Sequence, residues 1–157
     1  MPELYKIFYT LFEKCYAAYK QNPNDKTNIL LITSLLETCI SFQDKMKPND
    51  IFENKFHIIW CTLAKEEPFR MAAVDCLLLL CSLQNHKTTD KKDTIEFWTC
   101  FGGLCSQSIS QTKNLDLEYE FHKQLCKTLV AYGIKIVRFL DSTFEEMIKR
   151  YLFKHFI

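Results

Sequence analysis

Apolar residues recur at intervals of three and four along almost the whole chain, and no stretch alternates apolar and polar residues with period two. The first apolar stripe shows the pattern and comprises Leu4, Ile7, Phe8, Leu11, Phe12, Cys15, Ala18 and Tyr19. This spacing is typical of an amphipathic α-helix, whereas a half-buried strand would alternate. The sequence therefore predicts an all-α fold.

Turn and capping signals divide the chain into helices that are predicted to start near residues 3, 27, 50, 68, 93, 115 and 142. The segments Asn22-Pro23-Asn24-Asp25 and Lys47-Pro48-Asn49 predict turns. Three predicted starts carry a capping box, and these are Asp50 with Glu53, Asp93 with Glu96, and Ser142 with Glu145. Pro68 fits the first turn of another helix, where its missing N–H costs nothing.

Taken in pairs, the predicted helices form units that begin near residues 3, 50, 93 and 142, a period in the mid-forties. Two helices per unit at this period are typical of HEAT or armadillo solenoids, whereas a four-helix bundle does not account for such regular spacing. We therefore expect one HEAT-like α-α superhelix over residues 1–157, with pairs at 3–43, 50–83 and 93–140 and a lone helix at 142–157. The last helix lacks the polar outer face of a capping repeat, which favours a segment of a longer array.

Charge and hydropathy restrict the classes of function. The chain has 20 Lys and Arg against 19 Asp and Glu, so no global basic field predicts nucleic-acid binding from charge alone. The amino terminus has no signal-peptide pattern, and the longest apolar run, from Met71 to Cys81, is too short to span a bilayer. We expect a soluble protein made in the cytosol, with no contact to a membrane.

The eight cysteines contain no C-x-x-C pair, and nearly all lie in apolar helical patterns. Such cysteines behave as small hydrophobic residues, so we expect them to be reduced and buried. The alternative is zinc, because His57 with Cys61 and His122 with Cys126 each place two ligands on one helix face. That site would need two distant helices to face each other at these positions, so no metal or other cofactor is predicted.

No phosphate-binding loop, H-E-x-x-H helix or G-x-S-x-G elbow occurs, so the sequence predicts no catalytic residues and no enzyme. Gly102-Gly103 lies inside a predicted helix, at a cost of about 1 kcal/mol for each glycine relative to alanine. Close helix packing or a kink is the expected reason for this pair, with approach of a ligand as the less favoured alternative.

Two stretches, FRMAAVDCLLLLCSLQNHKTTDKKD and FHKQLCKTLVAYGIKIVRFLDS, resemble a central part of the exportins of the karyopherin-beta superfamily. The shared features are an alanine pair before Asp75-Cys76-Leu77-Leu78, a basic loop ending in Asp90-Lys91-Lys92, Phe101-Gly102, and the set Tyr119, Glu120, Phe121, Lys123, Leu125 and Cys126. The resemblance runs from about residue 4 to residue 142 and includes the helices IFYTLFEKCYAAY and LITSLLETCISF.

The resemblance implies a segment of a nuclear export receptor that carries pre-microRNA and other double-stranded RNA with Ran-GTP and passes nucleoporins between nucleus and cytoplasm. Such a receptor works by binding and catalyses nothing, and it holds RNA through phosphates and shape. The candidate RNA contacts are Lys87, Lys91, Lys92, Lys123 and Lys127. The alternatives are that these lysines only solvate a loop and a helix face, and that the chain is a stand-alone helical scaffold that binds other proteins.

Overall fold

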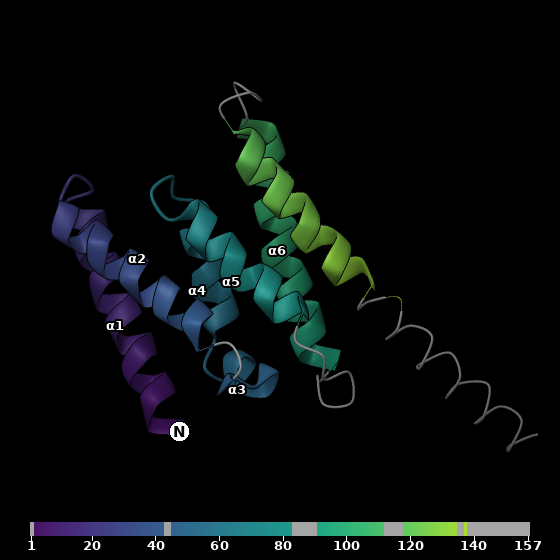
Figure 1. Cartoon of the computed structure of the whole chain (residues 1–157), viewed down its shortest axis with the longest axis horizontal. Coiled ribbons are helices and arrows are strands. Elements are labelled where there is room, and N and C mark those ends of the chain that lie inside the picture. Colours follow the sequence, from purple (N-terminus) through teal and green to yellow (C-terminus); the bar gives the residue numbers. More distant parts are fainter. Residues whose placement is uncertain (1, 43–44, 83–90, 112–117, 135–136, 138–157) are drawn as a thin grey trace, which may run out of the picture.

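The computed structural model describes residues 2–42, 45–82, 91–111, 118–134 and 137 (Figure 1). The helices are α1 (Pro2–Gln21), α2 (Lys26–Ser41), α3 (Pro48–Glu53), α4 (Phe56–Leu63), α5 (Arg70–Ser82) and α6 (Lys91–Gln111). A further helix, without a label in Figure 1, covers residues 119–134. The described residues contain no strand, and the predicted all-α fold is confirmed.

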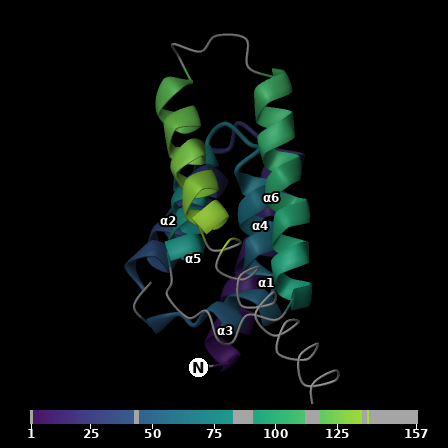
Figure 2. The same cartoon turned by 90° about the vertical axis from the view of Figure 1, so that its right-hand side faces the viewer.

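The helices stack as antiparallel pairs in two layers. α1 packs on α2 and α4 packs on α5, while the 119–134 helix lies beside α6. Between pairs, α2 contacts α5 and α4 contacts α6, so like-positioned helices of successive pairs are neighbours. Figure 2 shows α6 and the 119–134 helix at one end of this stack. This arrangement is a helical-repeat solenoid, as predicted.

The core lies where the first two pairs meet, around Phe56 and Trp60 of α4. Both side chains are fully buried, and the Phe56 ring lies in T-shaped contact with Tyr5, Tyr9 and Phe12 of α1 at centroid distances of 6.0 to 6.4 Å. Edge-to-face aromatic pairs at these distances add to the free energy gained by burial. The other fully buried large side chains are Phe12, Phe69, Phe97, Phe101, Ile32, Leu36, Ile51, Leu63, Leu77 and Leu80.

The helix that was predicted to start at Asp50 is two helices. α3 begins at Pro48 after Lys47, whose side chain makes no capping bond, so the predicted box of Asp50 with Glu53 is wrong. α3 ends at Glu53, and Lys55 has a left-handed backbone (φ 58°) directly before α4. The apolar stripe keeps helical spacing across this break, which explains why the pattern alone did not reveal it.

Two other predicted helix starts are shifted. Residues 67–69 form turns and α5 begins at Arg70, so Pro68 lies before the helix rather than in its first turn. Asp93 lies inside the first turn of α6, and Glu96 accepts hydrogen bonds from Lys55, so their predicted capping box is wrong. The predicted helix at 142–157, with its box of Ser142 and Glu145, falls outside the described residues.

The predicted turn at residues 22–25 also caps the next helix. Asp25 is the N-cap of α2, and its carboxylate accepts a hydrogen bond of 2.9 Å from the Thr27 amide. Within the described residues, no helix combines the length and apolar character that crossing a bilayer requires.

Two leucines of α2 test the packing between pairs. Leu36 is fully buried, whereas Leu30 is 66% exposed. We expect Leu36→Ala to lower the free energy of unfolding by about 2–5 kcal/mol, because it removes a buried side chain and leaves a cavity. The matched control Leu30→Ala should change it by no more than about 0.5 kcal/mol. Urea unfolding followed by circular dichroism measures both, and equal effects would contradict this packing.

Candidate functional site

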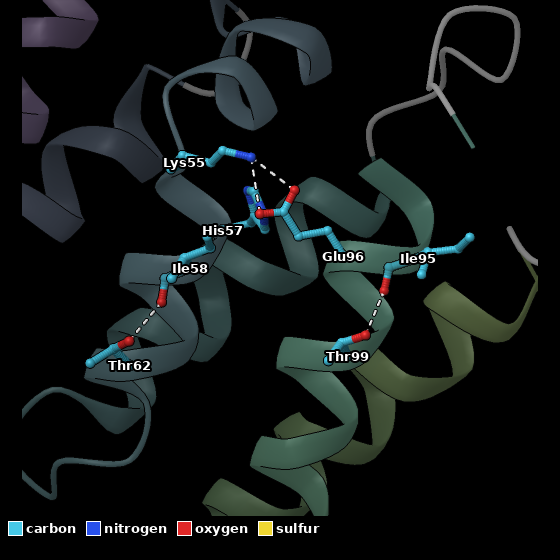
Figure 3. Close-up of polar contacts among 7 residues, drawn as sticks. All are labelled: Lys55, His57, Ile58, Thr62, Ile95, Glu96 and Thr99. Atoms are coloured by element: carbon cyan, nitrogen blue, oxygen red, sulfur yellow. Dashed lines mark hydrogen bonds and ion pairs between the residues drawn. The ribbon is translucent and has the colours of Figure 1, made fainter. Parts of the chain in front are cut away.

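A polar cluster joins the second helix pair to the third (Figure 3). The left-handed backbone at Lys55 lies just before α4, and its ammonium donates to Glu96 of α6 at 2.9 Å (Oε1) and 2.8 Å (Oε2). Beneath this ion pair lies His57, whose Nε2 is 3.7 Å from Glu96 Oε1. The cluster therefore fixes the start of α4 against the first turns of α6.

Charge and burial shift the pKa values in this cluster in opposite directions. The hydrogen bond with Lys55 lowers the pKa of Glu96, and the same bond raises the pKa of Lys55. His57 is fully buried, and neither ring nitrogen has a hydrogen-bond partner among the described residues. Loss of hydration lowers the pKa of His57, although Glu96 opposes this shift. His57 is therefore a neutral, packed side chain near neutral pH, and its ring contacts that of Phe52 at 4.8 Å.

Similar polar links occur between the first and second pairs and within the third pair. The first pair is tied to the turn after α4, because Glu66 accepts from the Tyr16 hydroxyl at 3.0 Å and from the Lys20 ammonium at 3.1 Å. Burial and the Glu66 carboxylate raise the pKa of Tyr16 to about 12, so the hydroxyl stays a donor. In the third pair, the Tyr132 hydroxyl donates to the Thr94 carbonyl at 2.9 Å. These links set the register between helices.

The zinc alternative finds no support in the arrangement of its four residues. Cys61 is buried, where loss of hydration raises the pKa of its thiol, whereas Cys126 is exposed on the 119–134 helix. His57 lies beside Glu96, and His122 lies 3.4 Å from Glu118. In the part of the chain that the structure describes, no three His, Cys, Asp or Glu side chains gather closely enough to hold a metal ion.

The cysteines are all free thiols with unequal exposure. The buried cysteines are Cys39, Cys61, Cys76 and Cys81, and the half-buried ones are Cys15, Cys100 and Cys105. Burial raises the pKa of Cys39 to about 12, which keeps it protonated. The expectation of burial is wrong for Cys126, because its helix is apolar on two sides and only one of them faces the core.

The candidate RNA contacts that the structure describes lie at two separate places. Lys87 lies outside the described residues, as does the side chain of Lys91, with which α6 begins. Lys92 is exposed in the first turn of α6. Lys123 and Lys127 are exposed one turn apart on the 119–134 helix, and Lys123 pairs with Glu120 at 3.2 Å.

The antiparallel packing keeps Lys92 away from the other two lysines. The bond between Tyr132 and the Thr94 carbonyl places the start of α6 beside the far end of the 119–134 helix. Lys123 precedes Tyr132 by nine residues, which is about 13 Å along a helix axis. Among the described candidates, Lys123 and Lys127 are the neighbours, one turn apart on the same helix.

Lys123 and Lys127 border an open, mainly apolar groove along the 119–134 helix, which the sequence reasoning missed. Its lining residues are Tyr119, His122, Lys123, Cys126, Lys127, Val130, Ala131 and Ile134. Val130 is 62% exposed although it belongs to an apolar pattern. The sequence contains a second set of apolar positions on this helix, opposite the buried Phe121 and Leu125, and this set indicates the groove.

Two smaller hollows lie elsewhere. A cavity of about 170 Å³ at one end of α1 and α2 is almost wholly apolar, and Tyr5, Phe8 and Met46 line it. A polar hollow of about 140 Å³ lies where α5 begins, and there Arg70 pairs with Glu118 at 3.6 Å and lies over the Phe121 ring. Two charged groups of the polar hollow, Arg70 and Glu118, therefore pair across a junction between elements.

The buried histidine predicts a dependence of stability on pH. Because the pKa of His57 in the folded state is below 6.5, the unfolded state binds more protons as pH falls below that value. The free energy of unfolding should therefore fall as pH decreases from 6.5 towards the folded pKa, by at most about 1.4 kcal/mol per pH unit. Because the pKa of Glu96 is lowered in the folded state, its contribution to the free energy of unfolding is lost only below about pH 4.5, the ordinary pKa of a glutamate.

Urea unfolding of the unsubstituted chain and of His57→Gln between pH 7 and pH 5 measures this effect. The variant should be less stable at pH 7, because a packed ring is lost, but its stability should depend less on pH. The other histidines are common to both proteins, so their titration cancels in the comparison. An identical slope in the two proteins would contradict a neutral, buried His57.

Comparison with known proteins gives one similarity that extends over most of the chain. The chain is 28% identical over 141 residues to Exportin-5 of Dictyostelium discoideum, a match that covers 85% of this chain and 12% of that protein. No family model matches the chain, and no solved structure matches it. The chain spans about an eighth of the length of this relative. The similarity supports an exportin-like segment built from stacked helix pairs.

Proposed function

We propose that this chain is a segment of a nuclear export receptor that moves structured RNA, such as pre-microRNA, out of the nucleus together with Ran-GTP. The observation that carries the proposal is the similarity to Exportin-5 across 85% of the chain. The stacked helix pairs support it, because a solenoid offers an extended surface to large partners. Ran-GTP, nucleoporins and shuttling between nucleus and cytoplasm belong to the whole receptor.

The proposed mechanism is binding without catalysis. The partly buried polar groups described above link helix pairs, as Glu96 does with Lys55 and Glu66 does with Tyr16. The exposed groups that remain for an RNA partner include Lys123 and Lys127. Residues four apart on a helix lie about 6 Å from each other, so both ammonium groups reach phosphates of one backbone. Recognition of this kind depends on charge and on the A-form shape rather than on base sequence.

The strength of the expected contact is limited by neighbouring acids. Glu120 pairs with Lys123 at 3.2 Å and reduces the local positive charge. A segment that contacts only a few phosphates binds weakly by itself and loses affinity steeply with salt. The segment therefore contributes part of a larger RNA surface in the receptor that we propose.

A hairpin RNA with a double-stranded stem tests the proposal in a filter-binding or fluorescence-anisotropy assay at increasing salt. We expect weak binding at low salt that Lys123→Glu with Lys127→Glu reduces at least tenfold. The slope of log K against log salt should decrease by about two, because each phosphate contact contributes about 0.9 in duplex DNA. The matched control is Lys6→Glu with Lys14→Glu, which makes the same charge change at exposed sites of α1.

Two outcomes would contradict this use of the 119–134 helix. Equal loss in both double variants would show an effect of net charge alone. An absence of RNA binding by the unsubstituted chain at low salt would remove the RNA role of this segment and would favour the alternative of a protein-binding helical scaffold.

A further inference from the structure

Two cysteines of the third helix pair lie at the same level on neighbouring helices. α6 and the 119–134 helix run antiparallel (Figure 2), and the Tyr132 ring stacks on the Trp98 ring at 5.7 Å between centroids. Cys105 follows Trp98 by seven residues, which is about 10 Å along a helix axis. Cys126 precedes Tyr132 by six residues, which is about 9 Å. The antiparallel register therefore places Cys126 opposite Cys105.

Both cysteines also lie on the outer flank of this helix pair. Seven residues make almost two full turns, so Cys105 is on the side of α6 from which Trp98 contacts the other helix. On the 119–134 helix, Gln124 donates to Asp75 and so marks the side that faces α5. Cys126 comes two residues later, about 160° around the helix, and therefore lies away from α5.

The two thiols are close enough to influence each other's ionisation. Burial raises the pKa of the Cys105 thiol, and a negative charge on Cys126 raises it further. Charges near a protein surface are screened beyond about 8 Å at physiological salt, so this effect identifies near neighbours. Helix axes packed about 8–10 Å apart bring Cα atoms along their seam to roughly 4–7 Å. A disulfide joins Cα atoms about 4.4–6.8 Å apart, so residues on such a seam can be bridged.

Solvent has access to this pair of thiols. The structure describes all eight cysteines, and among them Cys126 is the exposed one, while Cys105 is half-buried. A Cβ atom at Gly102, one turn before Cys105, would meet only the Trp98 side chain, at 4.0 Å, and one at Gly103 would meet no neighbouring element within 4 Å. The glycine pair thus serves no close packing between the described helices, which was one expected reason for it. It leaves the flank of α6 beside Cys105 open.

We propose that Cys105 and Cys126 form a reversible disulfide within the chain when the protein meets a hydroperoxide such as hydrogen peroxide. The Cys126 sulfur attacks one peroxide oxygen, so an S–O bond forms, the O–O bond breaks, and the thiol proton leaves with the released hydroxide as water. The Cys105 sulfur then attacks the Cys126 sulfur. The S–S bond forms, the S–O bond breaks, and the Cys105 proton leaves with the hydroxide as a second water molecule.

The two steps balance and can be reversed. Two thiols lose two electrons and two protons in total, and one hydrogen peroxide molecule is reduced to two water molecules. Two molecules of a small thiol such as glutathione then restore Cys105 and Cys126 by exchange and are themselves joined as a disulfide. Disulfides that form transiently in otherwise reducing surroundings typically respond to oxidants.

A second pair of cysteines shows why proximity alone is not enough. Cys39 of α2 and Cys76 of α5 are both buried, and the Cys76 thiol donates to the Leu36 carbonyl at 3.6 Å. Burial raises the pKa of Cys39 to about 12 and that of Cys76 well above its ordinary value. These thiols stay protonated and shielded from solvent, so a peroxide does not oxidise them in the folded chain.

The disulfide would join α6 to the 119–134 helix between the two ends of their contact. It would restrict both the unfolded chain and movement of one helix along the other. The proposal does not depend on RNA binding, because it concerns only the chemistry of the two thiols.

Mass spectrometry of the full chain after mild treatment with hydrogen peroxide tests the proposal. We expect the monomer to lose the mass of two hydrogen atoms, and trypsin to release fragments 93–113 and 124–127 joined to each other under non-reducing conditions. Dithiothreitol should separate these fragments. The oxidised chain should unfold at a higher urea concentration than the reduced chain, because the cross-link restricts the unfolded state.

Three variants assign the sulfurs. Cys105→Ser should abolish the joined fragments and leave Cys126 as a sulfenic acid, which dimedone labels. The matched control Cys100→Ser removes another half-buried cysteine of α6 from the same tryptic fragment and should keep the cross-link. Cys126→Ser, at an exposed position, should abolish the cross-link and keeps the test informative if Cys105→Ser does not fold.

Four outcomes would overturn the proposal. These are a sulfenic acid on Cys126 that persists in the unsubstituted chain without joined fragments, a cross-link that survives Cys105→Ser, a cross-link that is lost in Cys100→Ser, and a cross-link between two copies of the chain. A chain whose thiols all remain reduced after the peroxide treatment would overturn it as well.

Discussion

The structure depends on apolar packing between successive helix pairs, with α4 at its centre. A helix in such a stack touches its partner within the pair and a neighbour in the next pair, so it must be apolar on more than one side. Phe56 meets the aromatic rings of α1, and Trp60 is buried on the same helix. Because each pair covers only one side of its neighbour, stability accumulates along the stack and decreases towards its ends.

Polar contacts between the pairs select the register and contribute little to the total stability. The ion pair of Lys55 and Glu96 is partly solvated, and exposed ion pairs stabilise by about 1 kcal/mol or less. Its geometric effect is to hold Lys55, the residue with the left-handed backbone between α3 and α4, against α6. His57 lies beneath this pair without a hydrogen bond to any of the described groups. Burial therefore favours the neutral ring over the charged one.

The surface offered to partners follows from the same stacking. The 119–134 helix presents Phe121 and Leu125 to the core and Lys123 and Lys127 to solvent, and a second apolar side with Val130 lies between them. The proposed RNA contact and a second, apolar side thus lie on one helix. The two differ in chemistry, because one depends on charge and salt and the other on apolar burial.

Local periodicity by itself determined the helical fold, the pairing into repeats and most of the buried residues, because an amphipathic helix records its own period in the sequence. It could not determine which of the apolar positions are buried, because Leu4, Ile7 and Leu11 belong to the first apolar stripe and are nevertheless exposed. Only the tertiary structure decided the break at Lys55, the partner of Glu96 and the separation of Lys92 from Lys123. These features depend on contacts between residues far apart in the chain, and such contacts leave no periodic signal in either segment.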